Sequence, residues 1–208
     1  ESGKTAHKSE VPVTLSDDER ARLSEVDKAA GRARMARMSG GVDIEALRAL
    51  SPGSFEGVEE GRHRAVAAEL NRSIGILRDM ATHHVINGQS KVEAVAAQAA
   101  QRKGKPGVIF ARRLDRVREI AARLKADGHE VLTITGADTS VEKDAIKRKF
   151  KGSNAILVAS DAAAVCANLQ TGKWLAQFDT PMTAMLHRQR QGRIDRIGQA
   201  EDVDLVDL

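Results

Sequence analysis

The sequence is poor in aromatic residues and contains a single cysteine, Cys166. Only 2% of its residues are Phe, Trp or Tyr, so Ala, Val, Leu and Ile must carry most of the packing. One cysteine excludes an internal disulfide and a cysteine-based zinc site, and it suits a reducing compartment. No histidine or basic residue stands beside Cys166 in sequence, so we expect a small packed residue rather than a nucleophile.

Long apolar runs are also missing. No stretch approaches the ~18 residues of a membrane span, and the first residues, ESGKTAHKSE, do not resemble a signal peptide. We therefore expect a cytoplasmic or otherwise intracellular protein with no membrane partner. High Ala and Arg content suggests a GC-rich genome, such as that of a bacterium or phage, and the missing initiator Met suggests a piece of a longer polypeptide.

Two nucleotide-binding signatures are incomplete or absent. Gly3-Lys4-Thr5 matches the end of a P-loop, but the earlier Gly, the preceding strand and the following helix are not in the sequence. We interpret the match as accidental; a small NTP-binding enzyme that uses Gly3 to Thr5 is the weakest alternative. The G-x-G-x-x-G fingerprint is missing after the first strand of the predicted sheet, which disfavours a dinucleotide-binding protein.

Charge and histidine content narrow the function little. The chain has 33 Lys and Arg against 29 Asp and Glu, a net charge of +4 that is compatible with nucleic-acid binding but does not require it. His63, His83 and His84 lie along a predicted helix without convergent partners, so we expect solvated histidines and no metal site.

The first part of the chain has helical periodicity. Ser16 and Glu19 form a capping box that opens a helix, and apolar residues recur at helical spacing further on. Gly and Pro clusters separate the segments. The predicted elements are an extended segment at Val11 to Leu15 and helices at Ser16 to Met38, Asp43 to Leu50 and Val58 to Ile86.

From Ser90 onward, helices alternate with nearly continuous apolar strands, which predicts a parallel sheet covered on both faces. The fold class is therefore α/β, either RecA-like or Rossmann-like, preceded by an α-helical region. Predicted strands are Gly107 to Ala111, Glu130 to Thr135, Ala155 to Ser160, Trp174 to Asp179 and Val203 to Val206. Predicted helices are Ser90 to Arg102, Leu114 to Ala126, Val141 to Phe150, Asp161 to Asn168 and Met182 to Gln191.

A basic stretch near the C-terminus, QRQGRIDRIGQ at Gln189 to Gln199, carries the clearest chemical signal. On a helix, Arg193 and Arg196 would lie on one face, where two guanidinium groups can converge on a phosphate. The stretch resembles motif VI of superfamily 2 helicases. Its ending RIGQ is typical of Swi/Snf-type DNA translocases and their bacterial RNA-polymerase-recycling relative.

Further segments support the resemblance. Lys105 to Leu124 is similar to motif IV of the second helicase lobe, Ile134 to Phe150 to the segment that follows it, and Ile156 to Gln170 to motif V. In the motif V segment the usual glycines are replaced, which puts its coupling of nucleotide to DNA in question. The replacing residues are Ala163, Ala164 and Cys166.

The resemblance implies the second RecA-like lobe of an ATP-dependent DNA helicase or translocase. It divides the chain into an entry thread (1–19), a helical protrusion (20–87) and the lobe (88–208). It implies double-stranded DNA and the N-terminal RecA-like lobe of the same polypeptide as partners. ATP and Mg²⁺ would act in the complete enzyme, and the chain alone would bind neither and be inactive. The alternative is a non-catalytic module that keeps the lobe as a scaffold for DNA or protein.

The resemblance also assigns site residues. Arg193 and Arg196 would be the catalytic arginine fingers and, together with Gln189 and Asp161, would bind the nucleotide. Polar and basic residues that follow the predicted strands would contact nucleic acid, because ligands of open parallel sheets collect at the carboxyl ends of strands. These are Arg112, Arg113, Thr135, Gly136, Thr139 and Ser160. Either Thr139 or Ser140 is expected to cap the helix that follows.

Overall fold

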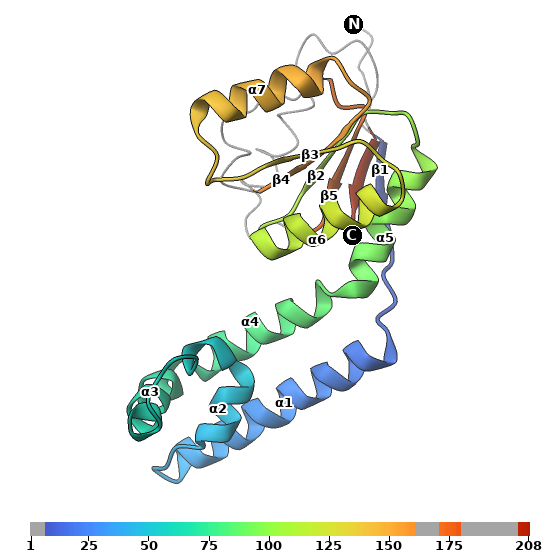
Figure 1. The fold of residues 1–208 in the computed structure, drawn as a ribbon. Coiled ribbons are helices and arrows are strands. Elements are labelled where there is room, and N and C mark those ends of the chain that lie inside the picture. The colour runs from blue at the N-terminus through green and yellow to red at the C-terminus, as the bar shows by residue number, and fades with distance from the viewer. Residues whose placement is uncertain (1–6, 161–170, 180–203) are drawn as a thin grey trace, which may run out of the picture. The chain divides into compact units, whose positions relative to one another are not determined.

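The computed structural model describes residues 7–160, 171–179 and 204–208, which are coloured in Figure 1. The chain divides into two compact units. One is a helical unit, Thr14–Gly88, and the other, the sheet unit, combines Glu1–Val13 with Gln89–Leu208. Within the described residues, no helix is both long and apolar enough to cross a bilayer.

The sheet unit contains a six-stranded sheet in which every described pair of neighbouring strands is parallel. The strand order is β1-β6-β5-β2-β4-β3. The predicted α/β fold with a parallel sheet is thus confirmed. Strand bounds are β1 (His7–Glu10), β2 (Gly107–Phe110), β3 (Val131–Ile134), β4 (Ile156–Ala159), β5 (Trp174–Gln177) and β6 (Asp204–Asp207).

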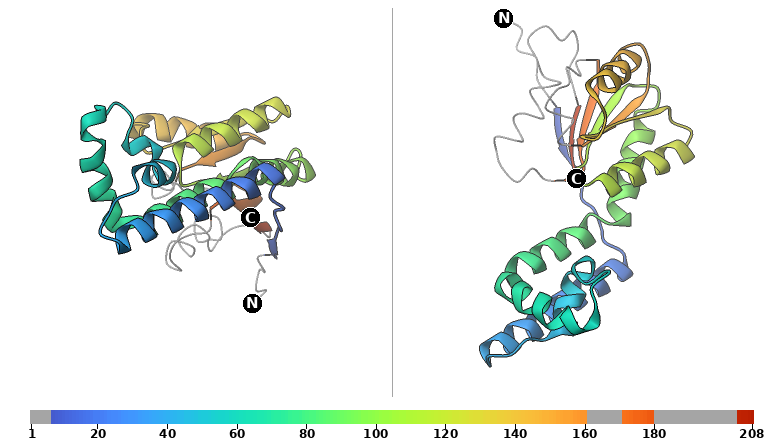
Figure 2. Two further views of the ribbon diagram at one scale, coloured as in Figure 1. Left: turned by 90° about the horizontal axis from the view of Figure 1, so that it is seen from below. Right: turned by 60° about the vertical axis from the view of Figure 1, so that its left-hand side comes forward.

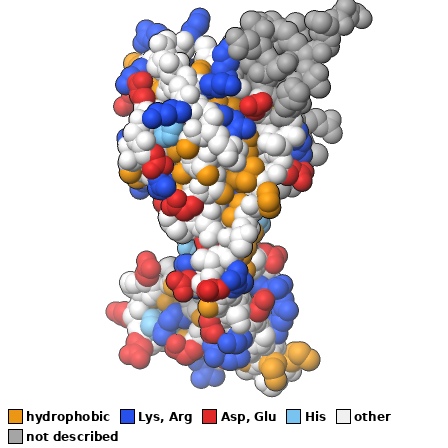
Figure 3. Space-filling model, turned by 90° about the vertical axis from the view of Figure 1, so that its right-hand side faces the viewer, with side chains coloured by type: hydrophobic (Ala, Val, Ile, Leu, Met, Phe, Trp, Pro, Cys, Tyr) orange, Lys and Arg blue, Asp and Glu red, His pale blue; other side chains and the backbone are white. Residues whose placement is uncertain are grey.

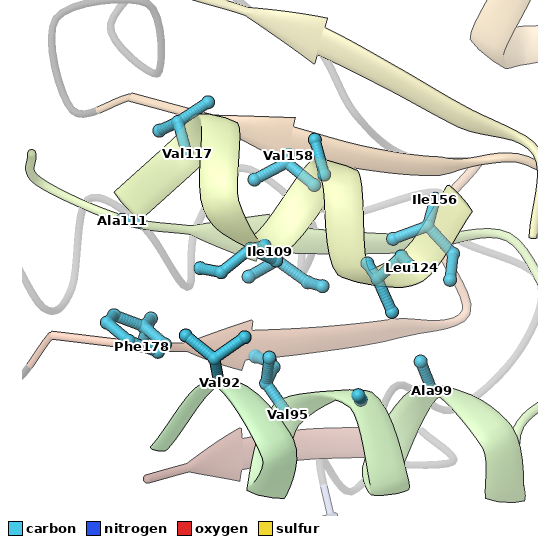
Figure 4. Close-up of a cluster of buried hydrophobic side chains, with 14 of the residues drawn as sticks. Val92, Val95, Ala99, Ile109, Ala111, Val117, Leu124, Ile156, Val158 and Phe178 are labelled. Atoms are coloured by element: carbon cyan, nitrogen blue, oxygen red, sulfur yellow. The ribbon is translucent and has the colours of Figure 1, made fainter. Parts of the chain in front are cut away.

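Helices cover both faces of this sheet. Helices α5 (Gln89–Gln101) and α6 (Leu114–Ala126) pack on one face, and α7 (Ser140–Lys151) packs on the other (Figure 1). Side chains of a strand alternate between faces, so Ile109 of β2 joins the α5–α6 side while Phe110 joins the α7 side. Figure 4 shows α5 and α6 directing valine and leucine side chains toward Ile109 and its neighbours. The continuous apolar strands follow from this double coverage.

The few aromatic side chains are concentrated in the interior. All four Phe residues and the one Trp are buried, so aliphatic side chains surround an aromatic minority that lies inside. Trp174 at the start of β5 is paired in register with Gly107 of β2, and its Nε1 donates to the Lys105 carbonyl oxygen at 3.2 Å. A Cβ atom at Gly107 would lie 2.0 Å from Trp174 Cε2, so only glycine fits beneath the indole.

The helical unit packs four α-helices around its own core. Glu19 and Ser16 form the predicted capping box at the start of the longest helix. Acidic and basic side chains are interspersed over the visible face of the unit, without a large patch of one sign (Figure 3). The helices, seen from two further directions in Figure 2, are α1 (Asp17–Met38), α2 (Ile44–Leu50), α3 (His63–Leu70) and α4 (Ile74–Ile86).

The single helix predicted from Val58 to Ile86 is wrong. Two short 3₁₀ segments, Glu60–Arg62 and Asn71–Ser73, and two α-helices, α3 and α4, occupy that range. Asn and Ser are weak helix formers, and the Asn71 side chain donates to the Gly41 carbonyl oxygen at 3.4 Å. Because α3 and α4 both contribute to the same core, their apolar spacing does not reveal the break.

His63 also differs from expectation, because it is half-buried rather than solvated. Its Nε2 lies 2.9 Å from the Val58 carbonyl oxygen, and its Nδ1 lies 2.9 Å from Nη2 of Arg48. A carbonyl oxygen can only accept, so Nε2 carries the hydrogen and Nδ1 accepts from Arg48. Its ring also meets Phe55 edge to face, with centroids 5.6 Å apart. His63 therefore has a structural role in the helical unit.

The N-terminal strand was missed by the sequence reasoning, which placed an extended segment at Val11 to Leu15. Strand β1 is instead the polar segment HKSE, His7–Glu10, which pairs with β6 at the edge of the sheet. Lys8 Nζ lies 3.1 Å from Asp207 Oδ2, and the Val11 N–H donates to the Asp207 carbonyl oxygen at 2.8 Å. Backbone pairing, rather than an apolar pattern, determines this strand.

Replacing Gly107 with Ala tests the packing of Trp174. We expect Gly107→Ala to lower the free energy of unfolding by about 1–3 kcal/mol or more, because the added methyl group overlaps the buried indole. Urea unfolding followed by Trp174 fluorescence measures this, since Trp174 is the one Trp. Gly152→Ala is the matched control, because a Cβ there meets no atom within 4 Å. Equal urea midpoints for both variants would refute the packing argument.

Candidate nucleic-acid interface

The residues that follow four neighbouring strands define the candidate site, which lies at the carboxyl edge of the sheet. In spatial order they are Asp179 after β5, Arg112 after β2, Ser160 after β4 and Thr135 after β3. The chain runs from β2 through β3 to β4 on one side of β2 and then continues to β5 on its other side. Ligands of open α/β sheets bind in the crevice at such a reversal. The boundary between β2 and β5 is therefore the centre of the site.

The side chain of Asp179 links the two strands at this boundary. It is buried, and its Oδ2 accepts a hydrogen bond from the Arg112 N–H at 2.6 Å. One residue earlier, the Phe178 N–H donates to the Phe110 carbonyl oxygen at 2.9 Å, so strand pairing continues up to the carboxylate. Asp179 is the last residue of the predicted strand Trp174 to Asp179 and is not among the predicted site residues. Its place at the end of a strand is the only feature of the sequence that points to the site.

Arg112 and Arg113 both follow β2 and are exposed. Arg113 is already paired with a carboxylate of the same chain, because its Nε and Nη2 donate to Asp115 at 3.0 and 2.9 Å. These hydrogen bonds raise the pKa of Arg113 and lower that of Asp115. The Arg112 guanidinium makes no hydrogen bond or ion pair with any other residue in the described ranges. Of the two, Arg112 is therefore ready to meet an anion, whereas Arg113 must first release Asp115.

The loop after β3 is closed by its own side chains. Asp138 Oδ2 accepts from the N–H of Thr135 at 2.6 Å and from its hydroxyl group at 3.0 Å. Gly136 is exposed at the tip of this turn. Both Thr135 polar groups thus have partners before any ligand binds.

Thr139 is the N-cap of α7, which decides between the two expected capping residues, Thr139 and Ser140. Its hydroxyl oxygen accepts from the Glu142 N–H at 3.3 Å, and its own N–H donates to Glu142 Oε2 at 2.8 Å. The start of α7 therefore holds the negative charge of Glu142, which stabilises the helix and stands where an external anion would bind.

Ser160 extends β4 by one residue, since its N–H donates to the Ile134 carbonyl oxygen at 3.0 Å. The residue is buried, and its Oγ has no hydrogen-bond partner among the described residues. A hydroxyl group in this state can still donate to a bound group. The remaining predicted site residues lie outside the described ranges: Asp161, Gln189, Arg193 and Arg196, together with Ala163, Ala164 and Cys166 of the motif V segment.

A buried lysine also belongs to this edge and was missed from the sequence. Lys91, in the first turn of α5, is 8% exposed, and its Nζ lies 5.4 Å from the centre of the Phe178 ring. Burial lowers the pKa of Lys91, and the charge of Asp179 opposes that shift. Nothing in the local sequence distinguishes Lys91 from a surface lysine.

Charge is unevenly divided between the two units. Between Thr14 and Gly88 the sequence has 12 acidic and 11 basic residues, whereas the remainder has 17 acidic and 22 basic residues. The net positive charge of the chain thus resides entirely in the sheet unit. An excess of positive charge near exposed arginines favours a polyanionic ligand.

Comparison with known proteins identifies relatives of this chain. Residues 90–198 match the family described as "Helicase conserved C-terminal domain". ATP-dependent RNA helicase dbp5 of Sclerotinia sclerotiorum is 32% identical over 103 residues, which cover 44% of this chain and 22% of that protein. RNA polymerase-associated protein RapA of Vibrio parahaemolyticus is 26% identical over 120 residues, 56% of this chain and 12% of that protein. The chain thus matches less than a quarter of the length of these relatives.

A solved structure shares the fold of both units. The C-terminal part of the Fun30 ATPase domain matches with a TM-score of 0.71 and 12% sequence identity, covering 99% of this chain and 85% of that one. At this identity the likeness concerns the fold alone. Because coverage is nearly complete, the helical unit is included in the match.

The Glu142 charge at the start of α7 predicts a pH dependence. Hydrogen bonds from Thr139 lower the pKa of Glu142 below its ordinary 4.5. Its contribution to stability is therefore present above that value, where the unfolded chain is also ionised, and is lost as pH falls through the lower folded pKa. Glu142→Gln should reduce stability at pH near 7 and make a smaller difference near pH 3. Urea unfolding at both pH values measures this, and a stability difference that is constant with pH would contradict it.

Proposed function

The chain belongs to the helicase conserved C-terminal domain family, as the C-terminal RecA-like lobe of a superfamily 2 helicase, and on this premise we propose that its parent is an ATP-dependent DNA translocase of the Swi/Snf type. The proposed nucleic-acid role rests on the residues at the carboxyl edge of the sheet. There the Arg112 guanidinium is exposed, the Ser160 hydroxyl has no partner among the described residues, and the two residues follow adjacent strands. One is a cation and the other a neutral donor, and both suit phosphate oxygens.

Two features favour DNA over RNA as the polymer. The RIGQ ending at Arg196 to Gln199 resembles the ending typical of Swi/Snf-type DNA translocases. RapA is a relative over more of this chain than dbp5, which is named as an RNA helicase. The proposed ligand is double-stranded DNA held by its backbone.

In this proposal Arg112 neutralises a phosphate, and Ser160 donates to a neighbouring phosphate or sugar oxygen. Arg113 joins them once it exchanges Asp115 for a phosphate. Gly136 approaches the DNA through its backbone at the exposed tip of the turn after β3. Thr135 and Thr139 order the loop around it, because their N–H and hydroxyl groups already have partners within the loop. Contacts of this kind position DNA without reading its sequence, so translocation along any sequence is possible.

ATP would be held mainly by a first RecA-like lobe elsewhere in the same polypeptide, since no complete P-loop is present in this sequence. We propose that Arg193 and Arg196 approach its γ-phosphate from the second lobe, supported by Gln189 and Asp161. Two guanidinium groups match the charge that develops on the transferred phosphoryl group. Mg²⁺ bound with ATP would neutralise part of the same charge.

A second candidate function is a non-catalytic module that retains the lobe as a scaffold for DNA or protein. It is favoured by Ala163, Ala164 and Cys166 in the motif V segment, where the family has glycines. Alanine is unfavourable where the backbone needs positive φ or close approach to a ligand. Upstream sequence distinguishes the two functions, because a motor requires a strand–P-loop–helix followed by a metal-binding Asp-Glu pair.

DNA binding by the chain itself is the first test. We expect weak binding of a duplex of about 20 base pairs, with affinity falling steeply between about 50 and 200 mM salt. Arg112→Ala should weaken binding several-fold and reduce the slope of log K against log salt by about 1. Lys125→Ala is the matched control, since Lys125 is exposed in the last turn of α6, at the opposite edge of the sheet. Equal losses for both variants would indicate nonspecific charge attraction and contradict the site.

ATP hydrolysis gives the second test. The chain alone should not hydrolyse ATP, and the full polypeptide with its first lobe should show DNA-stimulated hydrolysis. In that full protein, Arg196→Ala should lower kcat by roughly 10³- to 10⁵-fold while nucleotide binding is largely retained. Hydrolysis by the isolated chain would refute the division of labour between lobes, and stimulation by RNA instead of DNA would overturn the choice of polymer.

A further inference from the structure

Lys91 occupies an unfavourable position for a cation. It lies in the first turn of α5, where the positive end of the helix dipole disfavours positive charge. It is also 8% exposed, so its ammonium group has lost most of its hydration. Both effects act against a charged lysine, and a compensating interaction is therefore required.

The loop after β5 supplies that interaction. The Lys91 ammonium stands over the face of Phe178 at 5.4 Å, within the range of a cation–π contact, which is strongest when the cation is desolvated. Phe178 is fully buried, and the next residue, Asp179, carries the negative charge that opposes the effect of burial on the pKa of Lys91. Lys91 thus lies over Phe178, the residue directly before Asp179 at the end of β5.

Asp179 in turn binds the backbone that follows the neighbouring strand, β2. Its carboxylate is buried and accepts the Arg112 N–H at 2.6 Å, a short hydrogen bond of the charge-assisted kind. A buried carboxylate without a nearby cation tends to become protonated or to move toward solvent. The ammonium on α5 therefore helps to hold the Asp179 carboxylate in place, and Asp179 fixes the backbone from which the Arg112 side chain extends.

We propose that Lys91 is a positioning residue for nucleic-acid binding: through Asp179 it fixes the backbone at Arg112, so that the Arg112 guanidinium is held ready for a phosphate of the DNA backbone. This inference rests on the proposed DNA-binding function. These interactions connect helix α5 with the segments that follow β5 and β2, at the point where the strand order reverses. Its effect is pre-organisation, since a loop that is ordered before binding loses less entropy when DNA arrives.

The test uses Lys91→Met in the 208-residue chain, because Met keeps the apolar length of the side chain and removes its charge. Amide hydrogen exchange at Arg112 reports directly on the hydrogen bond to Asp179. We expect exchange at Arg112 to accelerate by about tenfold more than exchange at Ile109, a core amide of the same strand. Affinity for duplex DNA should fall several-fold, beyond the loss caused by Lys125→Met, which removes an exposed charge at the opposite edge.

Two further variants separate the mechanism from general damage to the fold. Lys91→Arg retains the cation and should preserve much of the slow exchange at Arg112. Asp179→Asn retains an acceptor oxygen and removes the negative charge, so adding Lys91→Met to it should have much less effect than in the native background. If Lys91→Met does not fold, Lys91→Gln, which also lacks the charge, takes its place, with acceleration at Arg112 relative to Ile109 supporting the proposal and equal rates overturning it.

The outcomes distinguish this inference from the function on which it rests. Exchange at Arg112 that changes no more than exchange at Ile109 would overturn the positioning role, whatever happens to DNA affinity. Faster exchange at Arg112 with DNA affinity unchanged in both Lys91→Met and Arg112→Ala would overturn the DNA-binding role of this loop. Faster exchange with weaker binding in both variants supports the whole proposal.

Discussion

The parallel alignment of the strands is the constraint on which the rest of the sheet unit depends. Because every described neighbouring pair is parallel, the carboxyl ends of β5, β2, β4 and β3 lie at one edge, and the described connections between strands cross over a face. The crossovers α5, α6 and α7 bury both faces, which leaves the loops as the places for polar chemistry. A continuous apolar sequence in the strands and a cluster of charged residues after them are two consequences of the same geometry.

At that edge the main energetic problem is a pair of buried charges. Lys91 and Asp179 would each be costly alone, and a buried pair is weak support for stability in itself. Their contribution is to fix the position of the loops, because the Asp179 carboxylate accepts the Arg112 N–H and so links the end of β5 to the end of β2. Other polar groups of the edge are arranged differently. Asp115 and Glu142 each hold a neighbouring group within their own segment, so the loops after β2 and β3 are ordered by local carboxylates.

Local patterns predicted most of the described strands and helices of the sheet unit and failed where tertiary pairing decides the outcome. The predicted helices at Asp161 to Asn168 and Met182 to Gln191 lie outside the described residues. GVIF and ILVA are recognisable strands because they are apolar throughout, and α6 has the predicted bounds because its apolar spacing is regular. HKSE became β1 only through pairing with β6, which no local pattern encodes. Arg112 and Ser160 were identified by their position after strands, and that position is a property of the fold. Lys91 and Asp179 come near each other only in the folded chain, and the sequence around each residue does not indicate the other.

The most direct measurement of the central claim is amide hydrogen exchange of the chain with and without duplex DNA. The account predicts added protection in the loops that follow β2 and β4, around Arg112 and Ser160, and little change in the turn between α6 and β3 at the opposite edge. Protection confined to the helical unit or to that opposite edge, with Arg112 and Ser160 unaffected, would contradict it.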